Sequence, residues 1–556
     1  MKKLKVGIII DDLLSNQYVF DLVNFISENE NFEDPVLISG YKINNSKNFL
    51  NKLTNKFQKN PFKLINNILK GILFKFIRVI EIRIVKKRYP KFQTYTDISS
   101  FNEFEMVKVN AIKSEYPFVE FTHQDLKLLT EKSLDCIVHC GSGILKGEIL
   151  NVPKFGVITY ESKEALGFSE VVNGDPSSIF EIKKLSHEGS KEEILFNGSL
   201  MTSNIWLANN TQLIEKSNIF LMKLLLDISI RRKLIKSNDP KLITNKLHEI
   251  NSTSILLKYL LRVIFPKIFN SIISKILSPN VIRYSVAYAY HEAHTKKLEY
   301  YKEVINPKGR FLADPFAFEH DDDNYIFVED LFFNDNKGRI SVLKIVDNKY
   351  EFLGVVLEED FHLSFPFIFR ENDEIYMIPE SHEHNDIRLY KCLEFPYKWD
   401  LDHILMSDIS AADTMIINKE NTWFMLTNIC SAGLSDHQSE LHIFYSNKLK
   451  SNSWHPIASG NPVIFDSLKG RNGGLFYHEN KIYRVNQAHG QAHYGKSFDI
   501  NEIISLTKDK YEEKECLNIN ADFKNAIIST HSFNANTSLA VIDFARHQRL
   551  RKALKT

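Results

Sequence analysis

The chain lacks several features that would assign it to a membrane or nucleic-acid-binding class. Its 556 residues contain no uncharged run of about 18 residues, so no transmembrane helix is predicted. The apolar run at residues 6–10 is too short for a secretory signal peptide, and acidic residues follow it directly. Lys and Arg (70) balance Asp and Glu (69), which gives no indication of a nucleic-acid partner. We therefore expect a cytoplasmic protein.

Cysteine and the common nucleophile motifs are also scarce. The five cysteines are scattered and odd in number, as is typical of reduced thiols in a cytosolic protein. Neither a Gly-x-Ser-x-Gly elbow nor a P-loop occurs. The histidine-rich segments 381–384 and 489–493 do not have the spacing of a standard zinc site. No metal site is predicted.

The C-terminal half repeats one pattern, in which an apolar strand, a polar turn and an aromatic-x-x-x-polar strand follow one another. The copies cover residues 311–330, 365–380, 413–427 and 473–487, with a last half-copy at 529–534. The second-strand aromatics recur at about the 40–60 residues of a propeller blade; they are Tyr325, Tyr376, Trp423 and Tyr483. A single hairpin buries only part of its surface, so we expect a radial arrangement. The pattern predicts an all-β five-bladed propeller over residues 284–548, with residues 284–288 as an added strand.

The repeat also indicates where a site would lie, because the first strand of each propeller blade lines the centre. Charged groups at otherwise apolar strand ends are costly unless they are paired or wet, so a ring of them suits a hydroxyl-rich ligand. The candidate catalytic residues are Asp314, Glu380 and Asp413. The candidate substrate-binding residues are His362, Arg471, Asn472, Gln487 and His531. The alternative for any single one of them is a turn-capping or blade-bridging role.

Residues 1–198 show the alternation of an α/β domain. Continuous apolar runs at 6–10, 35–39 and 135–140 predict buried parallel strands, and 18–25 predicts a helix. This order favours a doubly wound sheet. Residues 141–148 follow a strand end, where such sheets place ligands, although two glycines there are equally typical of a tight turn.

Two stretches predict basic or apolar helices. Residues 52–91 hold twelve Lys or Arg against one acid, Glu81, with apolar residues at helical spacing. A basic amphipathic helix suits the surface of an anionic membrane, and the alternative is a helical insert packed on the sheet. Residues 199–283 predict a helical connector with helices at 211–234 and 254–277 and a kink at Pro266. These helices either cover a domain interface or make a second membrane contact.

Parts of the first domain resemble a known family. Residues 135–158, 167–176 and 193–198 resemble the folate-dependent formyltransferases. That family uses an Asn, a His and an Asp, and the matching positions here hold Thr159, Glu161 and Ser190. The resemblance therefore implies a formyltransferase-like fold with a degenerate centre and no cofactor. The alternative is an active sugar N-formyltransferase that uses formyl-tetrahydrofolate, with Glu161 as its base.

The repeat region resembles a second family. The motifs at 309–316, 337–341, 362–367, 376–380 and 412–414 resemble the N-terminal propeller domain of glucosamine inositolphosphorylceramide transferases. That domain is similar in turn to five-bladed arabinanase-type glycoside hydrolases, which use an Asp in blade one, an Asp in blade two and a Glu in blade three. Only Asp314 stands where this scheme requires; blade two offers Ser364 and Phe365, and blade three offers Asp413.

Together these features predict a carbohydrate-active or glycan-binding protein that builds or modifies a cell-surface polysaccharide or glycolipid. The expected partners are a glycan, a nucleotide sugar or a glycolipid, with peripheral contact to the inner face of an anionic membrane through residues 52–91. The two resemblances favour a transferase, either formyltransferase-like or glycan-modifying. The alternatives are an active sugar N-formyltransferase, a propeller glycoside hydrolase and a non-catalytic membrane-associated scaffold.

Overall fold

The computed structural model describes residues 2–39, 61–89, 91, 94–98, 104–112, 118–160, 166–186, 193–234, 253–276, 280–290, 298–431 and 436–554. The chain forms two compact units, Met1–Lys267 and Ile268–Thr556. The connector predicted for residues 199–283 is divided between them, so the three-part division stays a prediction. Among the described residues, no helix combines the length and apolarity needed to cross a membrane.

Unit 1 is built on a seven-stranded sheet with the order β12-β11-β10-β8-β1-β3-β5. Its strands are β1 (Val6–Ile9), β3 (Val36–Ser39), β5 (Met106–Lys108), β8 (Cys136–His139), β10 (Val157–Tyr160), β11 (Ser177–Lys184) and β12 (Glu193–Met201). The first five are parallel, and β11 and β12 are antiparallel. β1, β3 and β8 are buried at every position, as their continuous apolar runs predicted.

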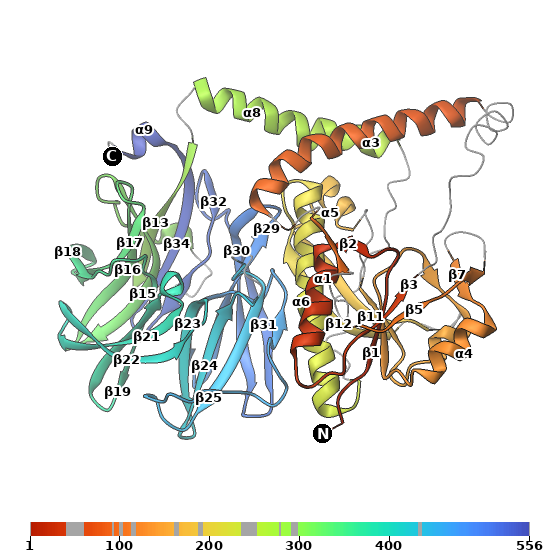
Figure 1. Cartoon of the computed structure of the whole chain (residues 1–556). Helices are drawn as coiled ribbons and strands as arrows, with labels where there is room; N and C mark the ends of the chain where they lie inside the picture. The colour runs from red at the N-terminus through yellow and green to blue at the C-terminus, as the bar shows by residue number, and fades with distance from the viewer. Residues whose placement is uncertain are drawn as a thin grey trace. The chain divides into compact units, whose positions relative to one another are not determined.

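Helices flank this sheet (Figure 1). They include α1 (Gln17–Glu28), α4 (His123–Glu131), α5 (Phe168–Asn173) and α6 (Trp206–Arg231). The side chains of Asn16 and Thr122 accept hydrogen bonds from free backbone N–H groups at the starts of α1 and α4. Short strands form two further sheets; they are β2 (Leu14–Asn16) with β4 (Tyr95–Asp97), and β6 (Ala111–Ile112) with β7 (Phe118–Phe121) and β9 (Ile144–Leu145). A mainly parallel sheet with helices fits the predicted α/β class, and the closer assignment to the formyltransferase fold stays a prediction.

Two long helical segments correspond to the basic and apolar stretches of the sequence. α3 spans Pro61–Arg88 within the predicted 52–91 segment, whose residues 52–60 lie outside the described residues. α7 (Thr253–Tyr259), a π-helical turn η3 (Leu260–Ile264) and α8 (Phe265–Ile276) run as one continuous helix, although the division between the units falls within α8. The π-helical turn directly precedes Pro266, where the sequence predicted a kink, because proline cannot donate the regular helical hydrogen bond.

Unit 2 consists of five sheets of four or five strands, which are the five predicted blades. Blades 1 and 2 comprise β15 (Arg310–His320), β16 (Asp323–Phe332), β17 (Lys337–Val346), β18 (Lys349–Leu357), β19 (Ser364–Glu371), β20 (Glu374–Glu380), β21 (Asp386–Glu394) and β22 (Lys398–Ser407). Blades 3 and 4 comprise β23 (Ala411–Lys419), β24 (Thr422–Ile429), β25 (Glu440–Ser446), β26 (His455–Pro456), β27 (Ile464–Phe465), β28 (Asn472–His478), β29 (Lys481–Gly490), β30 (His493–Leu506) and β31 (Tyr511–Asn520). The hairpins read from the repeat are thus confirmed.

Blade 5 joins the two ends of the propeller. It comprises β13 (Asn280–Tyr290), β14 (Lys302–Glu303), β32 (Ile527–Ser529), β33 (Phe533–Ala535) and β34 (Leu539–Arg549). β13 pairs antiparallel with β34 along its whole length, from Asn280 opposite Arg549 to Tyr290 opposite Leu539. The strand predicted at 284–288 therefore completes the fifth sheet by joining the first strand of the propeller to its last.

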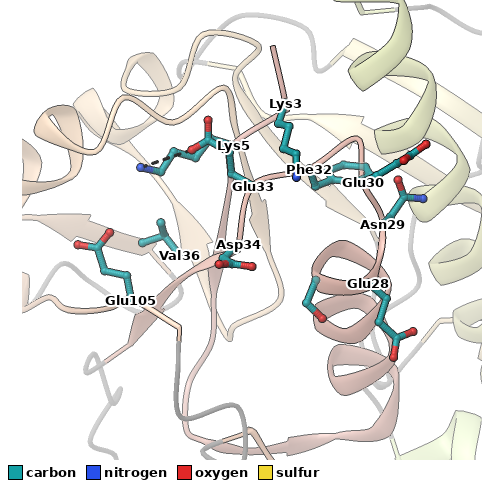
Figure 2. A pocket seen from close by; sticks show the side chains of 11 residues that line it. Lys3, Lys5, Glu28, Asn29, Glu30, Phe32, Glu33, Asp34, Val36 and Glu105 are labelled. Atoms are coloured by element: carbon teal, nitrogen blue, oxygen red, sulfur yellow. Dashed lines mark ion pairs between the residues drawn. The ribbon is translucent and has the colours of Figure 1, made fainter. Parts of the chain in front are cut away.

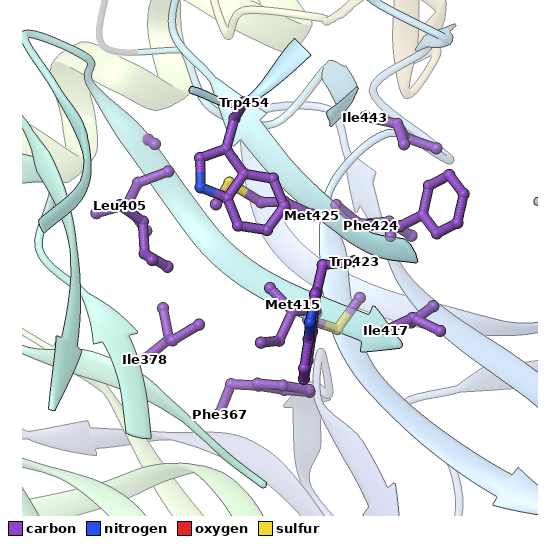
Figure 3. Packing of buried hydrophobic residues seen from close by; sticks show 14 of the residues in the cluster. Phe367, Ile378, Leu405, Met415, Ile417, Trp423, Phe424, Met425, Ile443 and Trp454 are labelled. Atoms are coloured by element: carbon purple, nitrogen blue, oxygen red, sulfur yellow. The ribbon is translucent and has the colours of Figure 1, made fainter. Parts of the chain in front are cut away.

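Apolar side chains hold neighbouring blades together. Figure 3 shows the cluster between blades 2 and 3, where Phe367 and Ile378 of blade 2 face Met415 and Trp423 of blade 3. The repeated second-strand aromatics belong to these layers, because alternate residues of each strand point into the space between the sheets. Polar residues of the repeat such as Asp314 and Gln487 lie within β15 and β29 but outside these apolar layers.

Candidate functional site

A bulge recurs in the first strand of the blades. In β15, β19 and β23 the pairing with the second strand skips a residue at Asp314, Phe365 and Asp413, and each of these has φ of 46°. A bulge re-aims its side chain, and left-handed backbone at a non-glycine residue is uncommon enough to indicate a specific constraint. The repeat thus brings Asp314 and Asp413 to equivalent places in blades 1 and 3, while Phe365 of blade 2 joins the apolar core.

Arg471 connects three blades. Its Nε donates to Asp413 Oδ2 at 2.6 Å, and one terminal nitrogen donates to Asp413 Oδ1 at 3.3 Å and to Glu380 Oε2 at 3.2 Å. His382 Nδ1 lies 2.6 Å from the other oxygen of Glu380. Gln487 Nε2 donates to Asp413 Oδ2 at 3.0 Å. Four predicted residues therefore meet in one buried network.

His531 lies at the centre of a second group of buried side chains, which it forms with Asp314 and Asp543. Its Nδ1 lies 2.6 Å from Asp543 Oδ2 and its Nε2 lies 3.5 Å from Asp314 Oδ1. Asp543 also accepts hydrogen bonds from the backbone N–H groups of Asp314, His531 and Ser532. All three side chains are buried, and the Asp543 carboxyl group is satisfied by these three backbone N–H groups together with His531.

Tyr494 joins the two groups. Its ring lies 5.2 Å from the Arg471 guanidinium and 5.2 Å from the His531 ring. The charges of Glu380 and Asp543 both raise the pKa of Asp314, so the groups also interact electrostatically. Residues from all five blades thus form one polar cluster, which we define as Asp314, Glu380, His382, Asp413, Arg471, Gln487, Tyr494, His531 and Asp543.

Glu380 and Asp413 have opposite proton affinities. Burial works against the ionised form of Glu380, but His382 and Arg471 outweigh it and hold its pKa below the ordinary value. Burial raises the pKa of Asp413 well above its ordinary value, and Glu380 adds to this against the opposing charge of Arg471. Two adjacent carboxyl groups rarely ionise together, so Glu380 carries the negative charge and Asp413 holds the proton.

Asp314 and His531 have pKa values closer to neutrality. Burial raises the pKa of Asp314 to about 7, although His531 opposes the shift. Burial lowers the pKa of His531, but Asp543 and Asp314 outweigh it and raise it to about 9. Asp314, His531 and Asp543 each offer one ligand atom within 4.8 Å of the others, which is the spacing of a metal site. A metal ion would require the neutral imidazole, whereas without an ion the protonated His531 pairs with the two carboxyl groups.

The remaining predicted residues have separate places. His362 Nε2 lies 3.2 Å from Glu329 Oε1 and its Nδ1 accepts from Gly338 N–H. Burial opposes the charge on His362, yet Glu329 raises its pKa to about 9. Asn472 donates to the backbone carbonyls of Asp413 and Leu426, which favours the blade-bridging alternative for this side chain.

Sequence reasoning missed three members of the cluster. Asp543 is the one charged residue in the apolar run 539–545, and a single charge in such a run indicates a buried side chain that needs a partner. His382 lies in the segment 381–384, which was considered only as a metal site. Tyr494 lies in β30, the third strand of blade 4, where the repeat gave no reason to look for an inward side chain.

In unit 1 the predicted turn at 141–148 lies at the carboxyl end of β8. Ser142 donates from its backbone N–H and its hydroxyl to Asp11 Oδ1, at 2.8 and 3.1 Å, which joins the segment after β8 to the segment after β1. Burial lowers the pKa of the adjacent His139 to about 4, so this imidazole is neutral. Glu161 and Ser190 lie outside the described residues, so the formyltransferase alternative stays a prediction.

A pocket of about 580 Å³ lies at the opposite edge of the same sheet. Figure 2 shows its lining, with Lys5 directed toward Glu33 and with Glu28, Glu30 and Asp34 around it. Lys5 and Val36 precede or begin β1 and β3, so the pocket faces the amino ends of the strands. Open α/β sheets bind ligands at the carboxyl ends, and we assign no function to this pocket.

Residues 302–539 match the family model described as glucosamine inositolphosphorylceramide transferase 1, N-terminal. Glucosamine inositolphosphorylceramide transferase 1 of Arabidopsis thaliana is 34% identical over 212 residues, which are 37% of this chain and 27% of the plant protein. The protein of the same name from Oryza sativa subsp. japonica is 34% identical over 210 residues, 37% of this chain and 28% of the relative. The chain thus matches little more than a quarter of each relative. The resemblance inferred from the motifs between 309 and 414 is confirmed.

Solved structures of glycoside hydrolases are also similar to part of the chain. The α-L-arabinanase of Cellvibrio cellulosa, complexed with arabinohexaose, shows 14% identity and a TM-score of 0.30 over 36% of this chain and 77% of its own. A family 117 glycoside hydrolase of the marine bacterium Zobellia galactanivorans shows 9% identity and a TM-score of 0.32 over 48% and 91%. Likenesses of this size carry no argument about activity.

The raised pKa of His531 predicts a pH dependence of stability. The folded pKa of about 9 exceeds the ordinary 6.5, so the stabilisation is fully present below pH 6.5 and is lost as the pH rises through 9. The difference corresponds to about 3 kcal/mol. Urea unfolding followed by tryptophan fluorescence across this range should show the loss in the parent chain and a much smaller one in His531→Gln. Substitution of the exposed His455 by Gln should leave the dependence intact. Equal pH dependence in parent and His531→Gln would contradict the assignment.

Proposed function

We propose that the polar cluster of unit 2 binds the sugar part of a glycan or glycolipid, in a protein that builds or modifies a cell-surface polysaccharide or glycolipid. The observation that carries the proposal is the joining of Asp413, Arg471 and Glu380 across three blades, with Asp314 and His531 beside them. The match of residues 302–539 to a family named for transfer to inositolphosphorylceramide supports a glycan-related role.

The chemistry of the cluster suits a sugar. An ionised carboxylate such as Glu380 accepts hydrogen bonds from sugar hydroxyls, and Arg471 donates to them, with charge-assisted bonds about twice as strong as neutral ones. Tyr494 offers an aromatic surface next to these groups. His362 and His382 are partly exposed, so the buried network reaches solvent on their side. A few convergent polar groups with an aromatic neighbour are typical of small-ligand sites.

The transferase part of the proposal rests on the names of the relatives. Both plant proteins are named as transferases, and this chain matches their N-terminal propeller region only. We place the sugar acceptor or its lipid-linked form in the propeller, and we assign no donor site.

A screen of the purified full chain against a glycan array and a panel of nucleotide sugars tests this proposal. We expect binding of one carbohydrate class by the parent chain. Arg471→Lys keeps the charge but loses the fork that spans Asp413 and Glu380, so binding should fall about tenfold or more. Arg546→Lys is the matched control, because Arg546 forms an ion pair with Glu303 in which each side chain is about one-third exposed. Failure of the parent to bind any member, or equal binding by both variants, would contradict the proposal.

Glycoside hydrolysis is the second candidate, favoured by the opposite proton affinities of Glu380 and Asp413. Two carboxyl groups with different pKa values are what an acid and a base or nucleophile require. Asp413 would then serve as the acid, with the ionised Glu380 helping to keep its proton in place, and Asp314 would serve as the base. Release of sugar from arabino- or xylo-oligosaccharides by the parent chain, abolished in Asp314→Asn, would support it. Absence of release by the parent chain would exclude this activity on these substrates.

A further inference from the structure

The outward face of α3 is apolar and unburied. Its side chains lie at successive helical positions on one side of the helix and are between 45% and 59% exposed; they are Ile65, Ile68, Leu69, Ile72, Phe76 and Val79. Contiguous exposed apolar surfaces of this kind mark contacts with a partner or a membrane. This face is therefore available for docking.

The opposite face of α3 is already packed against unit 1. Ile77 lies in a buried cluster with Trp206, Tyr259 and Leu256. Glu81, the single acid of α3, is fully buried, where it accepts hydrogen bonds from the Tyr259 hydroxyl and from Leu207 N–H. Burial raises the pKa of Glu81, although these hydrogen bonds oppose the shift. The inner face thus fixes which side of α3 points outward.

The continuous helix formed by α7, η3 and α8 repeats the arrangement. Tyr259 and Ile264 face the same buried cluster as Ile77. On the other side, residues between 45% and 65% exposed follow one another along the part of this helix that belongs to unit 1; they are Leu257, Leu261 and Phe265. α3 and α7 contact each other within unit 1, so the apolar rows belong to neighbouring helices (Figure 1).

The charges on these helices have one sign. α3 carries the exposed cations Lys75, Arg83, Lys86 and Lys87, and η3 carries the exposed Arg262. No acid other than buried Glu81 occurs in the sequence of α3, α7, η3 or α8. A protein partner would need an apolar groove lined with acids at matching positions, whereas an anionic bilayer offers both an apolar layer and a negative surface at every point.

We propose that the outward faces of α3 and of the neighbouring helical segment from Leu257 to Phe265, both within unit 1, form a monotopic docking surface for a membrane that contains anionic lipids. The apolar side chains enter the boundary between headgroups and acyl chains, and the lysines and arginines lie among the anionic headgroups. This surface is separate from the polar cluster of the propeller. The proposal therefore holds or fails independently of glycan binding.

Flotation of the full chain with vesicles tests this docking surface. We expect the parent chain to float with vesicles of phosphatidylcholine mixed with phosphatidylglycerol, and to float weakly with phosphatidylcholine alone. Lys86→Glu with Lys87→Glu should weaken binding to the anionic vesicles roughly tenfold or more. Ile72→Ser with Phe76→Ser should weaken it as strongly, because the apolar contribution is lost.

Matched controls use exposed positions of unit 2. Lys308→Glu with Lys349→Glu makes the same charge change, and Ile305→Ser removes an exposed apolar side chain. All variants alter exposed side chains, and circular dichroism checks that they fold. Equal flotation of the parent chain and both docking-surface variants would overturn the proposal. So would failure of the parent to float, or its association into dimers that the Ile72→Ser, Phe76→Ser variant abolishes.

Discussion

Arg471→Met is expected to lower the free energy of unfolding of the propeller by about 3–5 kcal/mol, because removing one partner of a buried ion pair leaves the other as an uncompensated buried charge. Only 12% of the Arg471 side chain is exposed, and it is bonded to Asp413 and Glu380 at once. Methionine fills much of the space but leaves the ionised Glu380 without this counter-charge. Asp413 already holds a proton and therefore leaves no second buried charge unpaired, which places the result toward the lower end of the range.

Urea unfolding followed by tryptophan fluorescence measures this effect, because three of the four tryptophans, Trp399, Trp423 and Trp454, lie in unit 2. The matched control is Arg546→Met. Arg546 and Glu303 are each about one-third exposed, so this substitution should cost about 0–1 kcal/mol. A loss at Arg471 no larger than that at Arg546 would contradict the buried network.

Trp206→Ala should destabilise unit 1 by about 3–5 kcal/mol, the usual cost of truncating a buried large aromatic side chain. Trp206 is fully buried and packs against Phe74 of α3 and Phe168 of α5, with ring centroids 5.3 and 5.5 Å apart. Its loss would open a cavity where α3, α5, α6 and α7 meet. Since this cluster holds the inner faces of α3 and α7, vesicle binding should weaken as well.

Differential scanning calorimetry checks the effect of Trp206→Ala, as a lower midpoint for the transition of unit 1 with that of the propeller retained. Tyr300→Ala serves as the control, because its side chain is 74% exposed and its removal should change stability by less than about 0.5 kcal/mol. An unchanged unit 1 transition in Trp206→Ala would show that the helices are not anchored through this residue.

The propeller was predictable from sequence because its repeat carries both the strand pattern and the turns. Tyr325, Tyr376, Trp423 and Tyr483 recur at blade spacing, and each falls in the second strand of its blade. The strand at 284–288 was recognised too, but its pairing with β34 joins residues more than 240 positions apart. Local pattern carries no information about such a pairing.

The candidate site was predictable in part. The repeat located Asp314, Asp413 and His531 at equivalent strand ends, and the structure brings each of them into the cluster. It could not show that Arg471 spans two carboxyl groups or that Asp543 neutralises His531, because these contacts join different blades or different strands. The pKa shifts follow from burial and from those contacts, so they too required the fold.

For α3 and α7 the sequence offered both a membrane contact and a packed helix and could not choose between them, for a different reason. A helix with apolar residues on both sides has the same sequence pattern whether its second face contacts a core, a partner or a bilayer. Only the packing of Ile77, Glu81 and Tyr259 shows which side is already used.

Isothermal titration calorimetry of the carbohydrate found by the array tests the central claim most directly, with the parent chain, Glu380→Gln and Glu351→Gln compared. Glu351 lies exposed on the outer strand β18, so its substitution is the matched control. We predict equal affinity for the parent chain and Glu351→Gln, and an affinity about tenfold or more weaker for Glu380→Gln, since a charged acceptor is lost. Equal affinity of all three would contradict a sugar site at the polar cluster.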